Sequence, residues 1–117
     1  MKPIVVYVDW LDWFSGKDYF VSGVMLFPFV CIHKNLRDTI DGKKKITHET
    51  IHFYQALETL GIGFYVLYLY QFLLNFFFYA SGWYDAYVMV SFEMEAFDNE
   101  EDFDYPSKRK WFAWRKY

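Results

Sequence analysis

The sequence predicts a small α+β domain in which two or three strands come first and three main helices follow. Two observations lead to this prediction. Short runs rich in β-branched and aromatic residues occupy the first 33 positions, and apolar residues recur at helical spacing from position 46 onward. A chain of 117 residues fits one domain and leaves no room for two, so residues 1–117 are expected to form one unit.

The strands are predicted in the N-terminal part of the chain. Ile4–Val8 is predicted as a strand because its residues are β-branched or aromatic. A turn-like stretch at residues 15–18 precedes a second extended region at residues 19–33. Pro28 lies inside this region. Since proline cannot donate to a sheet ladder, this strand should lie at a sheet edge or bend there.

Three helices are predicted after a polar segment at residues 35–45. Within this segment, Asp41-Gly42 signals a turn. The helices follow from apolar residues at helical spacing and cover about residues 46–60, 64–79 and 84–101.

Local breaks separate these predicted helices. Gly61 and Gly63 end the first helix. Ser81-Gly82 separates the second helix from the third, and Pro106 stops any continuation of the third. The basic and aromatic tail at residues 108–117 should pack as a short helix or lie on an apolar surface.

The second predicted helix is unusually apolar. Residues 64–80 are interrupted only by Gln71 and Asn75, and the uninterrupted stretches are too short to span a bilayer. We expect a buried or interfacial helix and keep a true membrane span as the alternative. The N-terminus lacks the apolar stretch and cleavage site of a signal peptide. A cytoplasmic location, with contact with a membrane surface, is the resulting expectation.

The composition narrows the classes of function. Aromatic residues make up 26% of the chain, which lets a short chain bury much apolar area and also leaves apolar surface for a membrane or a partner. A net charge of −3 argues against a nucleic-acid binder, which would usually be basic. The single cysteine, Cys31, cannot form an intramolecular disulfide and is predicted to be buried, which favours a reducing compartment.

The run His48-Glu49-Thr50-Ile51-His52 carries the clearest chemical signal. Positions four apart share one face of a helix, so both imidazoles can hold one Zn²⁺ at about 2.0–2.1 Å. Glu49 lies beside that face, where it can take a proton from a water. A zinc ion lowers the pKa of a bound water to roughly 7, which makes hydroxide available at neutral pH. This spacing predicts two metal ligands and one general base from a single helical turn.

A catalytic zinc also needs a third protein ligand. Glu58 stands where a third histidine would follow in the metzincin pattern, so that arrangement is disfavoured. Glu93 and Glu95 lie on the third predicted helix, two residues apart, and therefore point to different sides. Both remain candidate ligands at this point, together with Asp85 and His33.

The motif together with Glu93-Met94-Glu95-Ala96 resembles the gluzincin pattern of zinc metallopeptidases. It is similar above all to the minigluzincins, small single-domain proteins that mirror the catalytic core of CAAX-type and antibiotic-sensing membrane peptidases. Short zincin-like proteins of Bacteroidetes and their phages look similar as well. The resemblance covers about residues 24–100. It implies a zincin-like fold, a peptide or protein substrate, and His48, His52 and Glu93 as zinc ligands.

The resemblance also has a departure. The family often carries an aspartate four residues after the ligand glutamate, where it supports a metal-binding histidine. This chain has Phe97 there. Asp98, Glu95 or Glu58 are the candidates to replace that support, because such partners orient the imidazole and tune the metal.

Further roles are open at the level of sequence. Tyr54, Tyr87 and His33 are candidate donors to the oxyanion or to substrate. An edge strand at residues 27–33 could align a peptide by strand addition, and residues 111–117 could cover the cleft. The alternative to a peptidase is a non-catalytic, zinc-stabilised or membrane- or virion-associated interaction module with a degenerate site. The sequence leaves the oligomeric state open.

Overall fold

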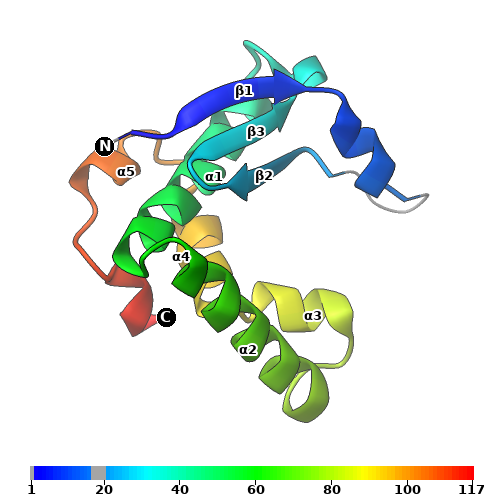
Figure 1. Cartoon of the computed structure of the whole chain (residues 1–117), viewed down its shortest axis with the longest axis vertical. Coiled ribbons are helices and arrows are strands. Elements are labelled where there is room, and N and C mark those ends of the chain that lie inside the picture. Colours follow the sequence, from blue (N-terminus) through cyan, green and yellow to red (C-terminus); the bar gives the residue numbers. More distant parts are fainter. Residues whose placement is uncertain (1, 17–20) are drawn as a thin grey trace.

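A three-stranded sheet and a set of helices form an α+β fold (Figure 1). The computed structural model describes residues 2–16 and 21–117. The strands are β1 (Ile4–Val8), β2 (Gly23–Leu26) and β3 (Phe29–His33), in the order β1-β3-β2. β1 runs parallel to β3 and β2 runs antiparallel to it, so β3 is the central strand. The prediction of a strand at Ile4–Val8 is confirmed.

The predicted extended region at residues 19–33 is a hairpin rather than one strand. Its described part forms β2 and β3, and Pro28 lies in the turn between them. The expected bend at Pro28 is therefore confirmed, but the edge-strand prediction for residues 27–33 is wrong, since β2 occupies that edge. Residues 17–20 lie outside the described residues, so the predicted turn at 15–18 and the start at 19 are described only in part. Two short 3-10 helices, η1 (Trp10–Phe14) and η2 (Lys34–Leu36), follow β1 and β3.

The first long helix, α1 (Ile40–Glu58), begins six residues earlier than predicted. Thr39 caps it, because its hydroxyl accepts a hydrogen bond from the Gly42 N–H at 2.9 Å. The predicted turn at Asp41-Gly42 is therefore wrong, and these residues form the first turn of α1. Glycine is required there because a Cβ on Gly42 would lie 2.0 Å from the carbonyl oxygen of Leu36.

A sharp corner joins α1 to α2 (Ile62–Phe78). Leu60 and Gly61 both adopt positive φ angles, of 61° and 76°, and the Gly61 N–H closes the helix on the Ala56 carbonyl. Gly61 thus ends α1 as predicted, whereas Gly63 lies inside α2. The axes of α1 and α2 differ by 108°, and α2 leads away from the sheet (Figure 1).

The predicted helix at residues 84–101 is two helices, α3 (Trp83–Val88) and α4 (Ser91–Asn99). Two polar side chains of α2 bind the backbone near the break between α3 and α4. Gln71 accepts a hydrogen bond from the Ser91 N–H at 2.8 Å, and Asn75 donates to the Ala86 carbonyl at 3.2 Å. The two polar interruptions of the apolar segment therefore bind the backbone at the end of α3 and the start of α4.

The C-terminal part folds back onto α1 and α4. It contains α5 (Tyr105–Lys108), in which Pro106 occupies the first turn, and η3 (Ala113–Lys116). Proline is tolerated at a first turn because the N–H that it lacks has no partner within the helix there. Pro106 therefore starts a short helix, while α4 has already ended at Asn99. The expectation that the tail packs as a short helix is confirmed for η3.

The core lies between the sheet and the helices α1, α2 and α4. Phe92 stacks on Phe64 with ring centroids 4.8 Å apart, and Trp114 of η3 packs on the other side of Phe92 at 4.8 Å. Cys31 is buried, as predicted. The fully buried apolar side chains that make up this core are Met25, Val30, Ile32, Phe53, Ala56, Phe64, Val90 and Phe92.

The outer face of α2 is exposed and apolar. Phe64 is the only buried residue of this helix, so the buried alternative is wrong for this segment, and the interfacial helix stays a prediction. The exposed fraction is 76% for Ile62, 57% for Leu69 and 70% for Phe77. Among the described residues, no single helix is both long and apolar enough to cross a bilayer; α1 and α2 pass that test only as a bent pair.

Candidate metal centre

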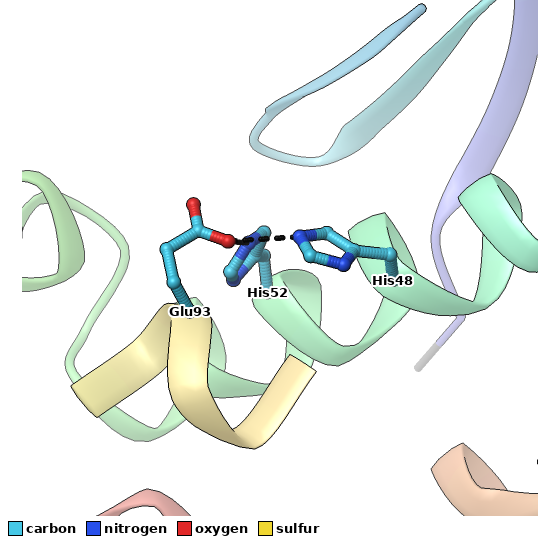
Figure 2. A group of neighbouring side chains, drawn as sticks. All are labelled: His48, His52 and Glu93. Atoms are coloured by element: carbon cyan, nitrogen blue, oxygen red, sulfur yellow. Dashed lines mark hydrogen bonds and ion pairs between the residues drawn. The ribbon is translucent and has the colours of Figure 1, made fainter. Parts of the chain in front are cut away.

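Two histidines and one glutamate meet in the interior between α1 and α4 (Figure 2). His48 and His52 lie one turn apart on α1, and both Nε2 atoms approach the same oxygen of Glu93, at 2.8 and 3.1 Å. The three ligand atoms lie within 4.8 Å of one another, and all three side chains are buried. The break before α4 directs Glu93 at the histidine pair. The site thus contains a buried His-His-Glu group that is positioned to bind a metal ion. His48, His52 and Glu93 are called the metal group below.

Each histidine is held from behind through its Nδ1 atom. His48 Nδ1 lies 2.8 Å from the carboxylate of Glu100, and His52 Nδ1 lies 2.7 Å from the amide oxygen of Gln55. Both acceptors favour the tautomer that carries its proton on Nδ1, which leaves the Nε2 lone pair directed at the site centre. This donor set and its outer partners fit a metal ligated by two imidazoles and one carboxylate.

Strong electrostatic coupling marks the same group. Burial alone would lower the pKa of His52, but the adjacent Glu93 carboxylate outweighs burial and raises that pKa to about 9. The pKa of His48 is also raised, since Glu100 and Glu93 outweigh the effect of burial. Burial would raise the pKa of Glu93, but the two imidazoles hold it well below its ordinary value. The buried carboxylate and the two imidazoles thus favour each other's charged forms.

The residue that departs from the gluzincin pattern packs on the metal group. The Phe97 ring lies 4.6 Å from the His48 ring, centroid to centroid. Glu100, one turn further along the chain, takes the place behind His48. Asp98 and Glu58 are wrong as this support, because Asp98 contacts the Tyr117 hydroxyl and Glu58 binds Arg109. Glu95 contacts neither imidazole directly, but it accepts a hydrogen bond from the Gln55 amide that contacts His52.

A cavity of about 570 Å³ opens beside the metal group. Glu49, His52 and Glu93 line it on one side, and β2 lines another. Most of the remaining wall is aromatic. It contains Phe64, Tyr65, Tyr68, Trp83, Tyr84, Tyr87 and Phe97. The predicted general base thus shares one cavity with two of the predicted ligands.

Of the three residues predicted to donate to the oxyanion or to substrate, only Tyr87 lies at this cavity. Tyr87 lines the cavity, as the sequence-based hypothesis requires. Tyr54 instead lines a different hollow beside Glu58. His33 is buried at the end of β3, where its Nε2 lies 2.9 Å from Asp12. Tyr54 and His33 are therefore wrong as contacts in this cavity.

The sequence analysis missed Tyr68. Its hydroxyl donates a hydrogen bond of 2.7 Å to the second oxygen of Glu93 and lines the cavity. It thereby leaves the first oxygen of Glu93 for the histidines or a metal. Nothing in the sequence distinguishes Tyr68 among 11 tyrosines, because its partner lies 25 residues away.

The other predicted ligands lie elsewhere. Glu95 is fully buried and binds Arg109 and Gln55 instead of the histidines. Asp85 accepts a hydrogen bond of 3.2 Å from the Ser81 N–H at the start of α3. In the described part of the chain, no residue of the segment 111–117 lines the cavity, so the predicted covering tail is wrong. That segment packs behind α4 through Trp114.

Comparison of the chain with protein-family models, with curated proteins and with solved structures finds no match. The zincin-like assignment therefore rests on the residues themselves and stays a prediction. The class that fold and site define is a small α+β protein with a buried His-His-Glu group positioned to bind a metal ion.

Proposed function

We propose that this chain is a zinc-dependent metallopeptidase with His48, His52 and Glu93 as metal ligands and Glu49 as general base. The observation that carries the proposal is the shared cavity: the glutamate next to the first histidine faces the same space as the metal group. Two imidazoles and one carboxylate are a ligand set found in catalytic zinc sites that keep an open position.

A zinc ion in this site would supply Lewis acidity toward a water and a peptide carbonyl. The residues of the chain then handle the protons. The Glu49 carboxylate accepts a proton from the attacking water as the oxygen bonds to the carbonyl carbon. It passes this proton to the amide nitrogen as the C–N bond breaks, so peptide and water become a carboxylic acid and an amine.

Tyr87 is the proposed donor to the oxyanion. Tyr87 lines the cavity, and burial together with the charge of Glu93 raises its pKa above the ordinary value. The hydroxyl therefore keeps its proton and can donate a hydrogen bond to a developing negative charge. The edge strand β2, which also lines the cavity, is available to pair with an extended substrate. The aromatic wall suits apolar substrate side chains.

The test pairs metal analysis with hydrolysis of a mixture of fluorescence-quenched peptides. The purified chain should bind one zinc per molecule, and His48→Ala and Glu93→Ala should each lose it. Glu49→Gln should keep the zinc and lose a factor of about 10²–10⁴ in rate. Glu101→Gln, an exposed control with the same change of charge, should retain both properties. Zinc without hydrolysis in the wild type would instead support a non-catalytic zinc-stabilised module.

A second proposal concerns membrane contact, and the side-chain directions of α2 favour it. The two polar residues of this helix, Gln71 and Asn75, face inward and bind backbone groups of the protein. Large apolar residues face outward instead. This is the reverse of the usual pattern on a water-facing helix, and it suits insertion among lipid acyl chains. Cosedimentation with phosphatidylcholine vesicles is expected; a chain that stays in the supernatant as a dimer would contradict it.

A further inference from the structure

We propose that Arg109 is a positioning residue for the metal ligand His52, acting through Glu95 and Gln55. The inference rests on the proposed metal site and adds a residue to it from the C-terminal part of the chain. Its basis is a continuous chain of short hydrogen bonds that runs from the guanidinium group to the imidazole.

The link nearest the metal group is the Gln55 side chain. Its amide oxygen accepts the hydrogen bond from His52 Nδ1 at 2.7 Å. Its amide nitrogen donates both hydrogens, to the Phe92 carbonyl and to Glu95, each at 3.0 Å. An amide whose two N–H groups are both used can present only its oxygen to the histidine. The two acceptors on α4 thereby set the direction of Gln55, and Gln55 fixes the orientation of the His52 ring.

The next link is Glu95, which has no exposed surface. Besides Gln55, its carboxylate accepts hydrogen bonds from the Tyr105 hydroxyl at 2.7 Å and from Arg109 Nε at 2.8 Å. A second Arg109 nitrogen contacts the oxygen that faces Gln55, at 3.0 Å. Two parallel N–H donors fix a carboxylate in both position and plane. Arg109 therefore determines where the acceptor for Gln55 lies.

Arg109 also spans the two helices that carry the metal ligands. Its Nη1 donates to Glu58 of α1 at 2.9 Å, and Nη2, which also contacts Glu95, lies 3.3 Å from the second oxygen of Glu58. Within the described residues, it is the one cation in contact with either of these buried carboxylates. Without it, Glu95 would lose both of its hydrogen bonds from the guanidinium group, and the partner of the Gln55 amide would no longer be held in place.

The other histidine provides an internal comparison. His48 is held directly by Glu100, which is partly exposed and paired with Lys44 at 3.5 Å. Only His52 depends on a buried relay to a distant cation. A change at Arg109 should therefore disturb one of the two imidazoles and leave the support of the other intact.

The experiment measures zinc affinity by competition with a chromophoric chelator, on the full chain, together with urea unfolding of the metal-free protein. Arg109→Gln and Gln55→Ala should each weaken zinc binding by about 10–100-fold, the usual effect of losing an outer partner of a ligand. The double variant should bind zinc no more weakly than the weaker single variant, because both changes break one relay. The absorption bands of bound Co²⁺ should shift in the same way in all three.

Different results are expected if Arg109 only stabilises the fold and does not orient His52. Glu58→Gln is the matched control, since it weakens the attachment of Arg109 to α1 but keeps the link to Glu95. It should lower stability and leave zinc affinity within about twofold. If Arg109→Gln also kept its zinc affinity, or if its effect multiplied with that of Gln55→Ala, the inference would be overturned.

Tyr105→Phe is a second variant, which tests the same chain of hydrogen bonds if Arg109→Gln does not fold. It removes one donor to Glu95 and keeps the charge of Arg109. It should weaken zinc binding by a few-fold, and an unchanged affinity would count against the relay. A wild-type chain that binds no zinc would overturn the proposed function and the relay together. Zinc binding in the wild type with no effect at Arg109, Gln55 or Tyr105 would overturn the relay alone.

Discussion

Ionisable side chains are buried in the interior between α1 and α4, whereas apolar side chains are exposed on the outer face of α2. In the interior, His48, His52 and Glu93 are each at most 5% exposed, although all three can carry charge. On α2, Val66 is 61% exposed and Phe77 is 70% exposed. Whether a side chain is buried in this protein therefore depends on the partners around it, and not only on whether it is polar or apolar. Buried polar atoms are stable when each has a partner, whereas apolar side chains remain outside when nothing in the chain covers them.

The largest expected effect concerns packing in the interior. Phe92→Ala should lower the free energy of unfolding by about 3–5 kcal/mol, because Phe92 is fully buried between Phe64 and Trp114. Phe77→Ala on α2 makes the same change at an exposed position and should alter it by less than about 0.5 kcal/mol. Urea denaturation measures the free energy of unfolding of both variants. An equal loss in the two would contradict the expected difference between the interior and the outer face of α2.

Next in size is the pH dependence of the metal-free protein. His52 has an ordinary pKa of 6.5 and a pKa of about 9 in the fold, so its contribution is fully present below pH 6.5 and is lost as the pH rises to about 9. The loss should reach about 3 kcal/mol, since each pKa unit corresponds to about 1.4 kcal/mol. Urea titrations in the presence of a chelator, between these two pH values, measure it. A stability that rose over this range would show that the histidines are not paired with Glu93.

A smaller effect is expected where the two regions meet. Gln71→Ala removes the acceptor for the Ser91 N–H and should cost about 1–3 kcal/mol. Gln71→Glu keeps an acceptor oxygen and should cost less. Thermal unfolding of the two variants decides the point. Should Gln71→Ala prove as stable as the wild type, the inward side chains of α2 would not be what holds the break between α3 and α4.

The smallest expected effect is on the outer face itself. Leu69→Ser should change the free energy of unfolding by less than about 0.5 kcal/mol, because Leu69 is 57% exposed. It should nevertheless reduce the fraction of protein that sediments with phosphatidylcholine vesicles. Ile40→Ser, at the exposed start of α1, is the control and should leave that fraction unchanged. Equal sedimentation of Leu69→Ser and wild type would remove α2 from the membrane proposal.

Local signals were sufficient for the elements that depend on local physics. The spacing of His48 and His52 predicted a shared helix face, and the coordinates place both rings on one oxygen of Glu93. The strand at Ile4–Val8 and the order of strands before helices also followed from residue type and periodicity.

The elements that the sequence did not reveal depend on partners far along the chain. The helical pattern of residues 84–101 is continuous, and the contact that holds the break comes from Gln71, which binds the Ser91 N–H from 20 residues away. Glu100 lies 52 residues from His48, so no local rule distinguishes it from the neighbouring acidic residues. The same holds for Tyr68, which reaches Glu93 across 25 residues.

Arg109 has a consequence for synthesis on the ribosome. The chain leaves the exit tunnel N-terminus first, so α1 and α4 emerge before the cation that binds Glu58 and Glu95. Until residue 109 has emerged, Glu58 and Glu95 have no guanidinium between them, although the apolar core can already bring α1 and α4 together. The hydrogen-bond chain that supports His52 is thus expected to be complete only after the segment that follows α4 has emerged.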